Sequence, residues 1–456
     1  MRPMFEGLYK ALYPKSIAVV GASNNPAKVG YSALKSVLES FRGRVYPVNP
    51  HADKVQGLTA YKSVRDIGER VDLGIICVPA EKAVEVSEEA AEEGFASLLV
   101  MSAGFRESED ERGKRLQEAL ASIAKRHGVR IIGPNTHGFI NLEYGLNATF
   151  VPGLSGKLRF GGISLIGQSG GVCHHILINA VMEGTGFNKV VNLGNRVDVD
   201  FPEMIRFLAF DRTTKVIALH VEGIDKGREF YEAVREASKL KKVVVLKTGR
   251  SKIANRASLS HTGSVAGNYE VFRSAMLQAG VAFVESITEL MDLSYAYSTL
   301  KCSGVKGGGV ALITLQGGVG ILFSDVLESK GGRLAKLSDK TLAGVRAVLP
   351  PRTFRENPID VSFMGLDEDV LRSIYRLLLE DDNVSIIVLT YAMAPQWELS
   401  LNIFEERAVK PTILGLSAEP DTIRRLRTRL EGRGVLVYPG PERAAVVAAL
   451  LGKYGC

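Results

Sequence analysis

Short runs of Val, Ile and Leu alternate with longer amphipathic segments along the whole chain. The runs end in Gly, Pro or Asn, and the segments between them are rich in Ala, Glu and Lys. Strands buried on both faces appear as continuous apolar runs, and helices connect them into parallel sheets. The pattern therefore predicts an α/β fold with three tandem doubly wound domains, Rossmann- or flavodoxin-like, whose sheets are mainly parallel.

Two Gly-rich passages, VPGLSGKLRFGG and CSGVKGGG, separate the predicted strands into three sets. We expect domains at residues 1–148, 149–300 and 301–456. The first set comprises SIAVVG, RVYPVNP, LGIICVP, SLLVMSAG and VRIIGPN. The second comprises GISLIGQSG, KVVNLGN, KVIALHVEG, KVVVLKTG and VAFVES. The third comprises GVALITLQGGVG, VSIIVLTYAM, KPTILGLSA and GVLVYPG.

The first predicted strand ends in GASNNPAKVG, residues 21–30, and a helix follows it. A Gly-rich turn at a helix N-terminus presents free N–H groups and the positive end of the helix dipole to a phosphate. The spacing is not GxGxxG, and turns of this kind also close sheets that bind no ligand. The turn favours a phosphate-bearing ligand, and its candidate contacts are Gly21, Ala22, Ser23 and Lys28.

The tip of the second predicted strand helps to decide which ligand is favoured. An NAD-binding fold holds the ribose 2′-hydroxyl with an acidic residue about 20 positions after the turn. Here the strand ends in Asn49 without a carboxylate, which disfavours NAD, and no Arg follows closely, although NADP stays open. Coenzyme A fits better, since its phosphates lie on a differently substituted ribose. The other candidates on this sheet edge are Val78, Pro79, Lys82, Ser102 and Asn135.

The second set of strands gathers chemical groups at one sheet edge. One strand ends in the turn QSGG before a helix, which again suits a phosphate, and two others end in Glu222 and Lys247. Strand ends of a parallel sheet share an edge, and the segment SHTGSVAG with His261 leaves from it. The candidate phosphate-binding residues are Gln168, Ser169, Gly170, Gly171 and Lys247.

His261 lies among Ser, Thr, Gly and Ala, which offer no apolar wall around its imidazole. One ring nitrogen could attack phosphorus while the carboxylate of Glu222 holds the other N–H and fixes the tautomer. The helix terminus and Lys247 would stabilise the transferred charge. A solvated His in a polar loop, beside surface charges that follow two strands, is the alternative interpretation.

The charge and cysteine content exclude several classes of protein. The net charge is +7, but no Lys/Arg block stands out and only 7% of residues are aromatic, which does not support a nucleic-acid partner. No uncharged apolar stretch approaches 18 residues, so we expect no membrane span. The four cysteines show no CxxC spacing, which favours a reducing, cytoplasmic location and no zinc ribbon.

The adjacent pair His174 and His175 follows Cys173 and could suggest a metal site. Neighbouring residues on a helix point about 100° apart, and no partner set has ligand spacing. We therefore expect no metal here and interpret the pair as part of a helix packing face.

Taken in order, the motifs closely resemble the α subunit of the ADP-forming acyl-CoA synthetases, which are acetate–CoA ligases of archaeal type related to succinyl-CoA synthetase. The motifs are GASNNPAKVG, PVNP, CVPAEK, GPNTHG, GQSGG, NLGN, VEGI, LKTGRS and SHTGSVAG, and the resemblance extends through the third domain with TLQGGVG and NPID. It implies CoA binding in residues 1–148 and phosphate and acyl chemistry in residues 149–300. It also implies that His261 is phosphorylated, that Glu222 supports it and that Gln168 to Gly170 cradle the phosphoryl group.

The chain departs from the resemblance at two places. Gln316 stands where Asn usually precedes the third-domain GGxG, and His174 and His175 replace small residues. Both departures leave the preferred acid and the third-domain contacts open.

No GxxxxGK[ST] motif and no ATP-grasp module occurs in the three predicted domains. The resemblance places that module on a β subunit or a fused C-terminal region. We therefore expect ADP or ATP with Mg²⁺ on a nucleotide-binding β partner with an ATP-grasp fold, in an α2β2 assembly.

The predicted function is interconversion of acyl-CoA, ADP and phosphate with a carboxylate, CoA and ATP, through an acyl phosphate and a phosphohistidine shuttled to the partner. Acetate is the expected acid, while branched and aryl acids stay open. The alternatives are an NADP-dependent oxidoreductase and a non-catalytic CoA-binding regulatory protein.

Overall fold

A computed structural model describes residues 5–108, 110–251, 253, 268–300, 308–393, 402–404 and 409–455. The chain forms two compact units. The first comprises Met1–Val181 and Gly186–Glu285, and the second comprises Met182–Thr185 and Ser286–Cys456. No helix of the described residues is long and apolar enough to cross a membrane.

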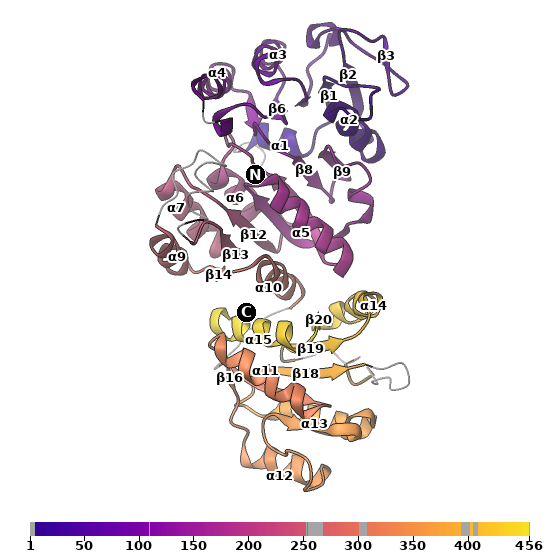
Figure 1. The fold of residues 1–456 in the computed structure, drawn as a ribbon, viewed down its shortest axis with the longest axis vertical. Helices are drawn as coiled ribbons and strands as arrows, with labels where there is room; N and C mark the ends of the chain where they lie inside the picture. Colours follow the sequence, from indigo (N-terminus) through magenta and orange to yellow (C-terminus); the bar gives the residue numbers. More distant parts are fainter. Residues whose placement is uncertain are drawn as a thin grey trace. The chain divides into compact units, whose positions relative to one another are not determined.

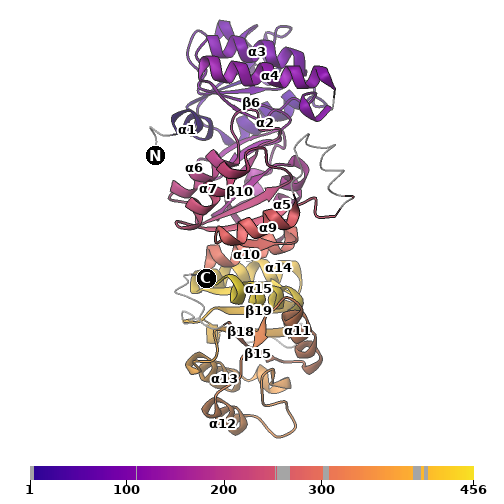
Figure 2. The same cartoon turned by 90° about the vertical axis from the view of Figure 1, so that its left-hand side faces the viewer.

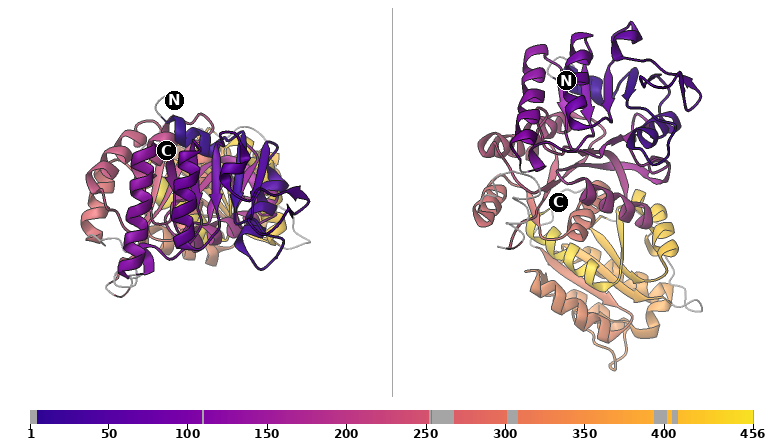
Figure 3. Two further views of the ribbon diagram at one scale, coloured as in Figure 1. Left: turned by 90° about the horizontal axis from the view of Figure 1, so that it is seen from above. Right: turned by 45° about the horizontal axis from the view of Figure 1, so that its top comes forward.

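The first unit begins with a five-stranded parallel sheet in the order β2-β1-β5-β6-β7 (Figure 1). Helices α3 and α4 cover one face and α1 and α2 the other (Figure 3). The elements are α1 Glu6–Leu12, β1 Ser16–Val20, α2 Val29–Ser40, β2 Arg44–Val48, β3 Lys54–Val55, β4 Leu58–Thr59, η1 Val64–Ile67, β5 Leu73–Ile76, α3 Ala80–Glu92, β6 Ser97–Val100, η2 Arg106–Ser108, α4 Glu111–His127 and β7 Arg130–Ile132.

The same unit contains a seven-stranded sheet in the order β14-β13-β12-β10-β11-β8-β9. Its strands are parallel except for β8 and β9, a hairpin that joins β11 antiparallel. Its elements are β8 Gly138–Asn141, β9 Leu146–Thr149, η3 Ser155–Lys157, β10 Arg159–Gly167, α5 Gly170–Glu183, β11 Gly186–Asn192, α6 Phe201–Phe210, β12 Val216–Val221, α7 Gly227–Ser238, β13 Lys242–Lys247, α9 Tyr269–Gln278 and β14 Ala282–Val284.

One continuous apolar core joins these two sheets. It contains Leu8 and Leu12 of α1, Phe139 of β8 and Phe201 and Phe207 of α6, all almost fully buried. Because the hairpin β8–β9 extends the second sheet towards the first, the two predicted N-terminal domains share this core. The division into three domains stays a prediction.

The second unit holds a sheet in the order β16-β15-β18-β19-β20, with β17 also paired to β15 (Figure 2). Helices α12, α13 and α14 contribute to the apolar core on one face. The elements are α10 Ile287–Thr299, β15 Gly309–Thr314, α11 Gly317–Ser329, β16 Arg333–Leu334, α12 Asp339–Val348, β17 Ile359–Asp360, η4 Ser362–Leu366, α13 Glu368–Glu380, β18 Ile386–Ala392, η5 Asn402–Phe404, β19 Thr412–Ser417, α14 Pro420–Leu430, η6 Glu431–Arg433, β20 Val435–Pro439 and α15 Pro441–Tyr454.

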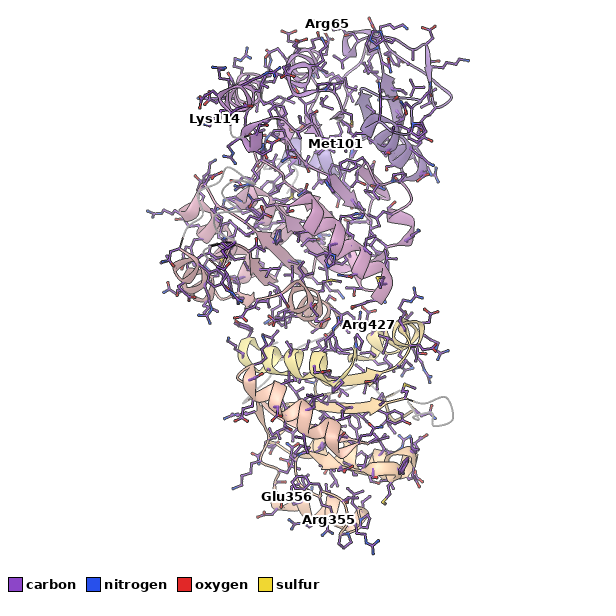
Figure 4. The ribbon with its side chains drawn as sticks, in the orientation of Figure 1. Arg65, Met101, Lys114, Arg355, Glu356 and Arg427 are labelled. Atoms are coloured by element: carbon purple, nitrogen blue, oxygen red, sulfur yellow. The ribbon has the colours of Figure 1, made fainter. Side chains whose placement is uncertain are left out.

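A partly buried ionic cluster links elements of this unit. Arg443 binds Glu183 through two hydrogen bonds of 2.7 and 2.9 Å, and its Nε donates to Asp292 at 2.8 Å. Arg427, labelled in Figure 4, also reaches Glu183, and its guanidinium lies over the rings of Tyr295 and Tyr438. The cluster anchors the short segment Met182–Thr185, which the chain passes through before β11.

The three large sheets have the doubly wound order 2-1-3-4-5 in their parallel strands, which confirms the predicted α/β fold class, while β3 and β4 form a separate antiparallel pair. In this order the second strand lies on one side of the first strand, and the third strand lies on its other side. The carboxyl ends of the first and third strands therefore diverge into a crevice where ligands bind. The pairs that flank the three crevices are β1 with β5, β10 with β12 and β15 with β18.

Candidate functional site

The turn after β1 approaches the end of β5 closely. Gly21 has φ of +83°, a conformation that favours glycine, and a Cβ there would lie 2.8 Å from Val78 Cγ1 and 2.9 Å from the Cys77 carbonyl oxygen. A Cβ at Gly30 would overlap the Gly21 carbonyl. The glycines thus let the turn lie against the start of α2, the geometry expected for a phosphate cradle.

The other predicted CoA-site residues on this edge are joined by hydrogen bonds. Asn49 donates from Nδ2 to the Ala22 carbonyl at 2.7 Å, and Ser102 donates from its hydroxyl to the Val78 carbonyl. The backbone N–H of Asn135, at φ +55°, donates to the Ser102 carbonyl at 2.8 Å. Residues from five strand ends are therefore linked along this edge, and the side chains of Asn49 and Ser102 hold the loops together.

The remaining members of the predicted CoA site are arranged differently. Ser23 is buried and accepts from the Asn25 N–H at 3.0 Å, and Pro79 immediately precedes α3. Lys28 precedes α2 and is exposed, so its ammonium is free to reach a solvent-facing phosphate. Lys82 lies in the first turn of α3 and forms an exposed pair with Glu85 at 2.6 Å. That any of them binds CoA stays a prediction.

At the second crevice, Gln168 bridges the ends of β10 and β12. Its Oε1 accepts from the backbone N–H groups of Glu222 and Gly223, both at 3.0 Å. Gln168 is 4% exposed, and its own N–H donates to the His220 carbonyl at 3.2 Å. The predicted phosphate turn and the predicted carboxylate are therefore held side by side by one amide.

The start of α5 is open at one glycine and closed at its neighbour. A Cβ at Gly171 would have only the Ser169 hydroxyl near it, at 4.0 Å, whereas a Cβ at Gly170 would lie 2.7 Å from Cγ and 2.8 Å from Nε2 of the His137 ring. The backbone of Ser169 accepts from the Cys173 N–H at 3.1 Å, which closes the first turn of the helix. The His137 imidazole thus packs directly on the helix start.

Lys247 reaches the same crevice from β13. Its Nζ donates to the Glu222 carbonyl at 2.7 Å and to the Thr248 carbonyl. Burial lowers the pKa of this ammonium, and the nearby carboxylate of Glu222 opposes the shift. Next to it, burial lowers the pKa of His220 to about 4, with a further contribution from the charge of Lys247, so this fully buried ring is neutral. His261 itself lies outside the described residues.

The two adjacent histidines on α5 have separate environments. His175 is exposed and its Nε2 lies 3.1 Å from the Asn179 amide, whereas His174 lines a pocket. The predicted packing face is therefore wrong for His175, because its place on the helix points it to solvent.

Two family models match this chain: a CoA binding domain over residues 15–141 and a succinyl-CoA ligase-like flavodoxin domain over residues 160–297. The α subunit of an ADP-forming acetate–CoA ligase II from Pyrococcus furiosus is 37% identical, with 96% of each chain covered. The chain belongs to the ADP-forming acetate–CoA ligase family. It is thus a ligase, and it corresponds to the α subunit.

Two further members place the chain within this family. An ADP-forming acetate–CoA ligase I from Archaeoglobus fulgidus is 35% identical, and its match covers 98% of this chain but 63% of that longer protein. A solved structure of acetyl-coenzyme A synthetase 1 from Ca. Korarchaeum cryptofilum, described in complex with phosphate and ADP, aligns with a TM-score of 0.85 and 30% identity over 98% of this chain and 96% of that one. These matches favour the ligase over the NADP-dependent oxidoreductase.

The sequence analysis did not identify Asn192, whose side chain connects the end of β10 with the loop that carries His137. Its Nδ2 donates to the carbonyls of Gly167 and Gln168 at 3.1 and 2.9 Å, and its Oδ1 accepts from the His137 N–H at 2.8 Å. The only available signal was the motif NLGN at the end of a strand, since the contacts join segments far apart in the sequence.

Proposed function

We propose that the chain catalyses the acyl and phosphoryl steps of an ADP-forming acetate–CoA ligase, with His261 as the phosphoryl acceptor. The observation that carries the proposal is the convergence of Gln168, Glu222 and Lys247 at the crevice of the second sheet, from which the segment with His261 departs. The small residues around His261 in the sequence suit a group that must move between two reaction partners.

CoA occupies the edge of the first sheet in this proposal. Its phosphates lie at the turn formed by Gly21, Ala22 and Ser23, with Lys28 as a counter-charge. The lack of a carboxylate at the tip of β2, where Asn49 stands, removes the group that would hold an NAD ribose. The family match to a CoA binding domain over these residues supports this placement.

The reaction proceeds by two displacements on this chain. A phosphate oxygen attacks the thioester carbonyl of acyl-CoA, so that a C–O bond forms, the C–S bond breaks and CoA leaves as the thiolate, which takes up a proton. A ring nitrogen of His261 then attacks phosphorus, a P–N bond forms and the acyl P–O bond breaks to release the carboxylate.

The residues at the crevice of the second sheet have separate roles in those steps. Glu222 accepts the other ring N–H of His261, which orients the nucleophile and stabilises the charged ring. The N–H groups of Gly170 and Gly171 at the start of α5 bind the phosphoryl oxygens, with Ser169 beside them. Lys247 supplies positive charge to the crevice through its position next to Glu222.

The last step belongs to a partner. An oxygen of ADP attacks the phosphohistidine, the P–N bond breaks and ATP forms. Relatives named as α subunits imply a separate β subunit. We place the nucleotide and Mg²⁺ on that subunit, with an ATP-grasp fold and an α2β2 assembly.

The chain alone, given acetyl-CoA, phosphate and Mg·ADP, should make no ATP until the partner is added.

Phosphate labelling tests the proposal. The complex is incubated with acetyl-CoA and labelled phosphate, and the label is mapped under alkaline conditions, where phosphohistidine survives. His261→Ala should abolish both the label and turnover, whereas Ser260→Ala, its neighbour, should retain both. Glu222→Gln should keep the fold and reduce the rate by about 10²-fold or more.

The competing interpretation, a non-catalytic CoA-binding protein, gives the opposite result. If His261→Ala turns over at the wild-type rate with the partner present, the phosphoryl-shuttle mechanism is wrong. An acid-stable label on Ser260 or Thr262 would equally reject His261 as the acceptor.

A further inference from the structure

Loops from the carboxyl edges of the first two sheets are in direct contact. Asn195, in the loop after β11, donates its backbone N–H to the Pro134 carbonyl at 2.9 Å. A Cβ at Gly194 would lie 2.3 Å from the same carbonyl oxygen, so this loop packs on the loop after β7 without room for a side chain. The predicted CoA edge and the crevice with Glu222 are therefore joined through these loops.

Asp225 is a point at which three of the loops meet. It lies three residues after Glu222, in the segment that connects β12 to α7. Its Oδ2 accepts from Arg196, in the loop after β11, at 3.2 Å. The same oxygen accepts from Nη1 of Arg106, in η2 after β6, at 3.4 Å. Arg106 also donates to the Asn195 carbonyl at 3.1 Å. Two guanidinium groups, one from each sheet, thus hold one carboxylate.

The two arginines are held to different degrees. Arg196 is buried, donates to Asp200 at 3.1 Å and lies with its guanidinium 5.6 Å from the centre of the Phe201 ring. The side chain of Arg106 is 25% exposed, and its second Nη group lies 3.5 Å from the Asp225 carboxylate. A partly exposed ion pair of this kind contributes little to the free energy of unfolding. We therefore expect the fold to survive the replacement of Arg106.

The backbone of Glu222 is fixed by the second sheet. Gln168 accepts from its N–H, and Lys247 donates to its carbonyl, which together set where β12 ends. The segment that follows is neither helix nor strand until α7 begins at Gly227, and the Asp225 carboxylate anchors it. Movement of Asp225 passes to Glu222 through two intervening residues. The direction of the Glu222 side chain therefore depends on what holds Asp225.

We propose that Arg106 is a positioning residue of the first sheet that, through Asp225, keeps the Glu222 carboxylate oriented for the phosphoryl acceptor. The inference rests on the proposed function, in which Glu222 accepts a ring N–H of His261. In this role Arg106 acts on the reaction without touching the substrate. The segment from Ser102 to Arg106 then serves both sites, since Ser102 is a predicted CoA contact.

Labelling from both directions tests this role. The complex with its nucleotide-binding partner is labelled from acetyl-CoA and labelled phosphate, and separately from γ-labelled Mg·ATP, a route that needs no CoA. Arg106→Met should slow phosphohistidine formation about tenfold by both routes, because the nucleophile loses its orientation. The KM for acetyl-CoA should stay within about twofold, since binding is kept. Asp225→Asn should give the same losses, and the double variant should be no slower than either single variant.

Two further variants separate positioning from a general loosening of the fold. Arg112→Met is the matched control, because Arg112 of α4 pairs with Glu81 of α3 at an exposed position of the same domain. It should change neither labelling rate. In a Glu222→Gln complex, Arg106→Met should cause no further loss, because its effect passes through the Glu222 carboxylate.

Three results would overturn the inference while the proposed function stands. The first is an unchanged labelling rate in Arg106→Met, and the second is a full additional loss in the Glu222→Gln complex. The third is a raised KM for acetyl-CoA with normal labelling from Mg·ATP, which would show that Arg106 contacts CoA directly. A wild-type complex that forms no phosphohistidine by either route would reject the proposed function, and this inference with it.

Discussion

The start of α5 allows a test of how closely His137 packs on the predicted phosphate turn, because Gly170 and Gly171 have different surroundings. In Gly170→Ala, the new methyl group would lie 2.7 Å from His137 Cγ and closer still to Cδ2, so the ring or the helix must move. In Gly171→Ala, the nearest atom is the Ser169 hydroxyl at 4.0 Å. The pair therefore compares a blocked position with an open one in the same turn.

The expected size of the difference follows from overpacking. Forcing a methyl group into a packed site costs about 1–3 kcal/mol. Both variants share the roughly 1 kcal/mol gain of Ala over Gly in a helix, so most of that gain cancels in the comparison. The His137 ring lies edge-on to Phe150 with centroids 4.6 Å apart, which limits its movement on that side. We expect Gly170→Ala to be about 1–3 kcal/mol less stable than Gly171→Ala.

Differential scanning calorimetry of the two variants measures this difference. For a unit of this size, 1–3 kcal/mol corresponds to a gap of about 2–6 °C between their unfolding midpoints. Phosphohistidine formation should fall at least tenfold in Gly170→Ala, since the same movement displaces the N–H groups of the turn. Adding His137→Ala should remove most of the stability gap. Equal midpoints for the two glycine variants would refute the packing argument.

Two further predictions concern ionisable side chains that are buried or partly buried. Arg443→Met should destabilise the second unit by about 3–5 kcal/mol, because it leaves the Glu183 and Asp292 carboxylates with less counter-charge. Thermal unfolding measures this loss, with Arg228→Met at an exposed position as the control. A fall in the unfolding midpoint no larger than that of the control would contradict the prediction. Burial lowers the pKa of His220 to about 4 in the folded chain, whereas the ring titrates near 6.5 in the unfolded chain. As the pH drops from about 6.5 to 4, the unfolded chain therefore takes up a proton that the folded chain does not. The free energy of unfolding should fall by roughly 3 kcal/mol over this range. His220→Leu should flatten that part of the stability–pH curve, whereas the exposed His51→Leu should not; parallel curves for wild type and His220→Leu would contradict the assignment.

The strands and the edge at which the candidate residues gather could be predicted from the sequence, because both follow from local patterns. Each apolar run that ends in Gly, Pro or Asn marks a strand and its carboxyl end, so Gln168 and Glu222 could be assigned to one edge. The hairpin β8–β9 was not predicted, since its short strands lack the crossover helix that reveals a parallel pair. The contacts of Asn192 and of His137 with the helix start were also missed, because they join loops far apart in the chain and depend on how the sheets pack.

The third sheet explains one departure from the family resemblance. At the end of β15, Gln316 accepts from the Ala392 N–H at 3.2 Å and donates to the Ala392 carbonyl at 3.5 Å, so its amide spans from the first to the third strand of the order. Gln168 makes the equivalent bridge from β10 to the residues after β12. Each amide follows the first strand, precedes a Gly-rich helix start and holds the backbone where the two strand ends diverge. An Asn side chain is one methylene shorter and would need the two strand ends to lie closer together, so Gln316 suits the width of this crevice. The substitution therefore preserves the bridge that the second sheet uses at its own site.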